Sequence, residues 1–93
     1  MDAAQAVGWF RKAAEQGDTS AAFNLGVMYA NGTGILADPV EAYRWLSIVA
    51  ARASGDEQIR GANALKVVAD ALSPTQIDDA RERARSWMER HKQ

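Results

Sequence analysis

The chain has 93 residues, 47% of them hydrophobic and 25% charged, with 11 lysines and arginines against 12 aspartates and glutamates. Such a length is sufficient for one domain with a modest core and too short for two. The formal net charge of −1 argues against a nucleic-acid-binding protein, which usually carries a basic stripe, and gives no reason to expect a membrane surface as partner. Because there is no cysteine, a disulfide framework and thiolate chemistry are excluded.

The sequence carries no membrane signal. No apolar run approaches the roughly 18 residues of a spanning helix, and the N-terminus lacks the basic and apolar regions of a signal peptide. We therefore predict no membrane insertion. The compartment stays open: the cytoplasm is the default, and the periplasm is the alternative if the chain is part of a longer protein.

Apolar residues recur at three- and four-residue steps and predict five helices joined by short loops. The first covers about residues 2–16, and Gly17 ends it. The second follows the N-cap Asp18 over about residues 19–30. Its central Gly26 costs about 1 kcal/mol relative to alanine, so we expect a neighbouring helix to approach closely there.

Three further helices have start signals of their own. After a loop signal at residues 31–34, Asp38 precedes a proline at the first helical position, and this third helix ends near residue 54. The fourth helix follows Asp56, and the fifth follows Ser73, again with a proline next. Short connections favour antiparallel hairpins, so the predicted fold class is all-α.

The apolar residues of these five helices are the predicted core. The residues expected to face inward are Ala6, Trp9, Phe10, Ala13, Ala14, Ala21, Ala22, Leu25, Met28, Tyr29, Ala42, Trp45, Leu46, Val49, Ala50, Ile59, Ala62, Leu65, Ala69, Leu72, Ile77, Ala80, Ala84, Trp87 and Met88.

The sequence also repeats itself. Residues 6–10 align with residues 42–46 at an offset of 36, and residues 17–18 match residues 55–56 at an offset of 38. A two-helix period in this range indicates an α/α superhelical solenoid. One hairpin cannot bury both of its faces, so stacked hairpins cover one another.

Residues 25–35, Leu-Gly-Val-Met-Tyr-Ala-Asn-Gly-Thr-Gly-Ile, are followed by Asp38, Ala42, Trp45 and Ala50. This pattern resembles a Sel1-like repeat, a family of TPR-like helical solenoids, with isoleucine in place of the usual valine after Gly-x-Gly. The similarity is strong over residues 6–55.

The resemblance implies a division of the single domain into three parts. Residues 1–17 resemble the second helix of a preceding repeat, residues 19–54 resemble one complete repeat, and residues 56–93 resemble a divergent C-terminal capping hairpin. The family consists of adaptor and scaffold proteins, many of them bacterial. The resemblance therefore implies a protein or peptide partner, no enzyme activity and no cofactor.

Binding residues must lie outside the packing positions. In helical solenoids the first helix of each hairpin lines the concave surface, which here means the second and fourth helices. The predicted partner-binding residues are Phe23, Asn24, Val27, Asn31, Arg60, Asn63 and Lys66. Exposed aromatic residues anchor interfaces, although Phe23 packing inside the domain, and Arg60 and Lys66 as plain solvated charges, are the alternatives.

A second hypothesis concerns the first helix, which lacks a hairpin partner in this chain. One side of Trp9 and Phe10 then has no cover within this chain. In a longer protein further repeats would cover it, whereas the isolated chain is expected to cover it with a second copy, as a two-fold homodimer. A remote third hypothesis is an accessory domain of an enzyme. No sequence motif identifies catalytic residues for such a role.

The last helix carries five basic residues, but acidic residues alternate with them, Asp79 and Arg83 forming a favourable four-residue pair. We therefore interpret the last helix as a solvated helix of mixed charge rather than as a nucleic-acid-binding surface. The single histidine, His91, is expected to be frayed and solvated. Together with Glu89 it would lack the further ligands that a metal site needs.

Overall fold

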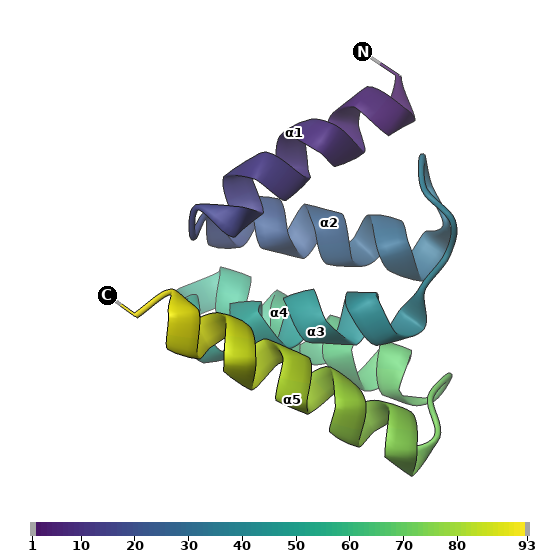
Figure 1. Cartoon of the computed structure of the whole chain (residues 1–93), viewed down its shortest axis with the longest axis vertical. Coiled ribbons are helices and arrows are strands. Elements are labelled where there is room, and N and C mark those ends of the chain that lie inside the picture. The colour runs from purple at the N-terminus through teal and green to yellow at the C-terminus, as the bar shows by residue number, and fades with distance from the viewer. Residues whose placement is uncertain (1, 93) are drawn as a thin grey trace.

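The computed structural model describes residues 2–92. Its helices are α1 (Ala3–Glu15), α2 (Thr19–Asn31), α3 (Pro39–Arg52), α4 (Gly55–Ala69) and α5 (Pro74–Arg90). Figure 1 shows α1 at one end of the molecule and α5 at the other, with α2 and α3 between them and α4 behind α3. The prediction of an all-α solenoid with five helices is confirmed.

The helix starts follow from local chemistry. The side chains of Asp18, Asp38 and Ser73 each accept a hydrogen bond from the backbone N–H three residues later, at 3.0, 3.1 and 3.2 Å. These caps satisfy donors that the first turn leaves free. Asp2, which the sequence had placed inside the first helix, caps it instead and forms a capping box with Gln5.

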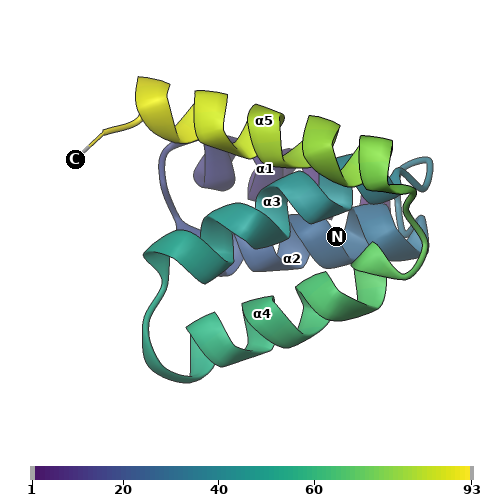
Figure 2. The same cartoon turned by 90° about the horizontal axis from the view of Figure 1, so that it is seen from below.

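Helix α3 is the centre of the fold. It packs against α2, α4 and α5, and Figure 2 shows it between the last two. Its buried side chains are Ala42, Tyr43, Trp45, Leu46, Ile48 and Val49. Helices α4 and α5 therefore both pack mainly on α3.

Two glycines permit close helix contacts. A Cβ on Gly26 would lie 2.9 Å from the Cγ of Leu46, so α2 approaches α3 closely, as predicted. A Cβ on Gly61 would lie 2.6 Å from Cγ1 of Val49, which brings α4 equally close to α3. The contact at Gly61 was missed, because a pattern of apolar residues does not report where a small residue faces the core.

Two residues that were predicted to face the core are exposed instead. Trp9 is 62% exposed, because α1 turns Val7 and Ala14 toward the rest of the fold. Ile59 is 57% exposed, because the core side of α4 is centred on Gly61 and Val68. Both errors come from helices that are packed on only part of their surface.

The C-terminal end is ordered by stacking. The ring of His91 lies parallel to that of Trp87, with centroids 3.9 Å apart, and its Nδ1 lies 2.8 Å from the carbonyl oxygen of Trp87. The expectation of a frayed, solvated histidine is therefore wrong. Trp87 in turn meets Trp45 edge to face at 5.6 Å, which covers the tryptophan of the complete repeat.

Candidate functional site

A groove of about 370 Å³ lies between α2 and α4. Its lining residues come from the first halves of the two helices: Ser20, Phe23, Asn24, Asp56, Glu57 and Arg60. Phe23, Asn24 and Arg60 were predicted from the sequence as partner-binding residues, and the fold brings these three together. The other three were not predicted.

Glu57 fixes the relation of the two helices at one end of the groove. Its carboxylate accepts hydrogen bonds from the hydroxyls of Thr19 and Ser20, the latter at 2.6 Å. These donors stabilise the charged form, so the hydrogen bonds from Ser20 and then Thr19 lower the pKa of Glu57 below its usual value. The first turn of α4 is thereby tied to the first turn of α2.

The remaining lining residues offer several kinds of contact. Phe23 is half-buried and packs against the core, so part of its ring forms an apolar floor. Asn24 and Arg60 are exposed beside it, and Asp56 adds a carboxylate at the α4 side. An apolar surface flanked by an amide and by charges of both signs is suited to contact with a peptide segment.

The other predicted residues do not line this groove. Val27 is half-buried, and Asn31, Asn63 and Lys66 are exposed outside it. Lys66 follows Arg60 by six residues and so lies about 240° further round α4. Helix geometry thus directs these two basic side chains to different sides.

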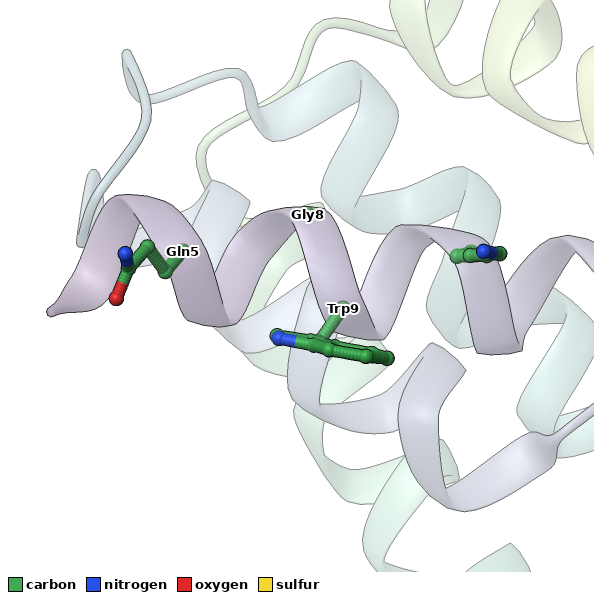
Figure 3. Close-up of a pocket in the computed structure, with 4 residues that line it drawn as sticks. Gln5, Gly8 and Trp9 are labelled. Carbon is green, nitrogen blue, oxygen red and sulfur yellow. The ribbon is translucent and has the colours of Figure 1, made fainter. Parts of the chain in front are cut away.

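A second exposed surface lies on α1. Trp9 stands at the centre of a shallow depression of about 500 Å³ whose other lining residues are Gln5, Gly8 and Lys12 (Figure 3). Phe10 is half-buried and packs against the core. Trp9 and Phe10, which were predicted to contact a second copy, therefore differ in exposure. Only Trp9 is strongly exposed.

The charged side chains of α5 pair as the alternating pattern predicted. Arg83 bonds Asp79 at 3.0 Å on its own helix and Glu41 of α3 at 3.1 Å. These carboxylates, Glu41 first, raise the pKa of Arg83 above its usual value. Arg85 pairs with Glu82 and lowers the pKa of that carboxyl. Much of the positive charge on this helix is thus matched within the chain.

Within residues 2–92, no three histidine, cysteine, aspartate or glutamate side chains are grouped so that they could hold a metal ion. None of the helices in the same range combines the length and the apolar character that crossing a membrane requires.

Comparisons with known proteins support the resemblance. The Sel1 repeat family model matches residues 2–18 and 19–53. Among solved structures, the chain is similar to a protective antigen present in uropathogenic Escherichia coli strains, whose crystal structure displays an SLR (Sel1-like repeat) fold. The identity is 31% and the TM-score 0.86 over 95% of this chain.

The chain spans 18% of the length of that antigen chain. No curated protein matches the sequence. Repeats of the Sel1 type are generally protein–protein interaction modules and typically non-catalytic scaffolds. With more than half of its residues matched by the family model, the chain belongs to the Sel1 repeat family.

Proposed function

We propose that this chain is a non-catalytic interaction module that holds a peptide segment of a partner protein in the groove between α2 and α4. The observation that carries the proposal is the meeting of Phe23 and Asn24 from α2 with Arg60 from α4 in one groove of about 370 Å³. The three-part division of the chain into a half repeat, a complete repeat and a capping hairpin belongs to the same proposal.

The chemistry of the groove suggests how a peptide is held. An apolar side chain packs on the exposed part of Phe23, and the amide of Asn24 exchanges hydrogen bonds with the peptide backbone. An acidic peptide side chain pairs with the guanidinium of Arg60, which favours planar carboxylates. Because Glu57 fixes the two first turns, the groove is formed before the partner arrives, which lowers the entropic penalty of binding.

A selection from a random peptide library on the immobilised chain tests the proposal. The selected peptides are then compared on the parent chain and on three variants, Asn24→Ala, Arg60→Ala and the matched control Lys66→Ala. We expect each groove variant to weaken binding at least about fivefold, as removal of an interface anchor does, and the control to bind normally. Peptides that bind all four proteins equally would place their site elsewhere.

Self-association through α1 is a second candidate function. The observation that favours it is the 62% exposure of Trp9, because aromatic side chains are enriched where protein surfaces meet. A molar mass that rises with concentration would support this candidate, and a strict monomer at millimolar concentration would exclude it.

A further inference from the structure

The two ends of the groove between α2 and α4 differ in charge. Both helices start on the same side of the molecule and run in the same direction (Figure 2). Ser20 contacts Glu57 across an offset of 37 residues, and the same offset pairs Phe23 with Arg60. The first turns therefore form one end of the groove, with Asp56 and Glu57, and the second turns form the other end, with Arg60.

Two of these charges are available to a partner. The carboxylate of Glu57 already accepts hydrogen bonds from the hydroxyls of Thr19 and Ser20. Asp56 and Arg60 are exposed, and within residues 2–92 neither takes part in an ion pair, with each other or with another residue. The groove thus offers a carboxylate and a guanidinium on one helix, separated by four positions.

We propose that the segment held in this groove is an extended peptide in which a basic, an apolar and an acidic residue follow one another. The basic side chain pairs with Asp56, the apolar side chain packs on Phe23, and the acidic side chain pairs with Arg60. The inference rests on the proposed function. It adds the charge pattern of the partner and its placement in the groove.

The spacing of the groove fits an extended backbone. Four positions of an α-helix advance by about 6 Å. Two residues of an extended strand advance by about 6.6 Å, and side chains two positions apart point to the same side. The first and third peptide residues can therefore both contact α4, at Asp56 and Arg60. The residue between them points to the opposite side, toward α2, where Phe23 lies.

A peptide of uniform charge fits this groove less well. An acidic segment would place a like charge against Asp56, with Glu57 and the N-cap Asp18 at the same end. A basic segment would place a like charge against Arg60. Because like charges that meet across an interface oppose binding, the groove favours a segment that carries both signs.

Capped synthetic peptides test the charge pattern. The core Lys-Leu-Glu, between flexible Gly-Ser ends, is compared with Glu-Leu-Glu, Lys-Leu-Lys and Lys-Ser-Glu at up to millimolar concentration. Amide chemical shifts of Phe23, Asn24 and Arg60 in the isotope-labelled chain report binding in the groove. We expect each altered peptide to bind about three- to tenfold more weakly than Lys-Leu-Glu, through loss of one charge pair or of the apolar contact.

A charge reversal in the chain then identifies the group that contacts the basic peptide residue. In Asp56→Lys the preference should invert, so that Glu-Leu-Glu binds more tightly than Lys-Leu-Glu. Asp70→Lys is the matched control, because Asp70 is exposed at the far end of the same helix, and it should keep the preference of the parent chain. A change in the peptide that compensates a change in the chain separates a direct contact from a general loss of structure.

The outcomes separate this inference from the proposed function. Groove binding with equal affinity for all four peptides, or an Asp56→Lys variant that keeps the parent preference, would overturn the charge pattern alone. So would library-selected peptides that bind in the groove while Lys-Leu-Glu does not. If neither the synthetic nor the library-selected peptides shift the groove amides, both the charge pattern and the proposed function are wrong.

Discussion

The indole nitrogen of Trp87 donates to Oε1 of Glu15 over 3.2 Å and so joins the last helix to the first. The two residues are separated by most of the chain, and the same indole ring lies between Trp45 and His91. The C-terminal end of α5 therefore covers Trp45, the tryptophan of the complete repeat, and also contacts the end of α1. This contact links the two helices that stand first and last in the chain.

The role of Trp87 predicts two different losses of stability. Trp87→Ala removes a fully buried ring and should reduce the free energy of unfolding by about 3–5 kcal/mol. Glu15→Ala removes only the acceptor and should cost about 0.5–1.5 kcal/mol. Urea unfolding followed by circular dichroism measures both losses of stability. Equal losses would show that packing of the ring is not the main contribution of Trp87 to the free energy of unfolding.

Trp9 and Trp45 occupy aligned positions 36 residues apart but differ in burial, at 62% and 1% exposed. Trp45→Ala should therefore destabilise the chain by about 3–5 kcal/mol. Trp9→Ala should change stability by no more than about 0.5 kcal/mol when measured in a dilute sample of about 10 µM. A large loss from Trp9→Ala in this dilute sample would mean that the indole packs against its own chain.

Gly8 and Gly34 should respond to alanine in opposite ways. Gly8 lies inside α1 with open space around it, so Gly8→Ala should stabilise the chain by about 0.5–1 kcal/mol through helix propensity. Gly34 has a φ of 74°, and a Cβ there would collide with the carbonyl of Ala3. Gly34→Ala should therefore lower the melting temperature, as thermal unfolding of the two variants can show.

Glu57 should make a pH-dependent contribution to stability. The hydroxyls of Ser20 and Thr19 lower the pKa of its carboxyl in the folded state below the ordinary 4.5. The contribution is therefore present above the ordinary pKa and is lost as the pH falls through the folded value. Glu57→Gln should lose less stability than the parent chain between pH 7 and pH 3, as denaturant titrations at the two pH values would show. Equal losses would mean that these hydrogen bonds do not depend on the charge of Glu57.

The sequence predicted what local chemistry decides. The caps at Asp18, Asp38 and Ser73 and the close approach at Gly26 all appear in the structure, because each depends on neighbouring residues or on one repeated motif. The exposure of Trp9 could not be obtained in this way. Its motif matches that of Trp45, and only the arrangement of α1 and α5 makes the two positions different.

The groove was predicted only in part for the same reason. Phe23, Asn24 and Arg60 were chosen because they lie on the first helices of the hairpins, away from the apolar stripes. Glu57 contacts Ser20 across 37 positions of sequence, and no local pattern reports such a pairing. Carboxylates are common in the first turn of helices, so Glu57 carries no sequence signal for its role of linking α4 to α2.

The central claim is that a peptide binds between α2 and α4. The most direct test is an amide chemical-shift map of the isotope-labelled chain, titrated with a peptide selected on it. The account predicts that the largest shifts cluster at Ser20, Phe23, Asn24 and Arg60 and disappear in Arg60→Ala, while those of α5 stay small. Shifts centred on α1 or α5, with the groove residues unchanged, would contradict it.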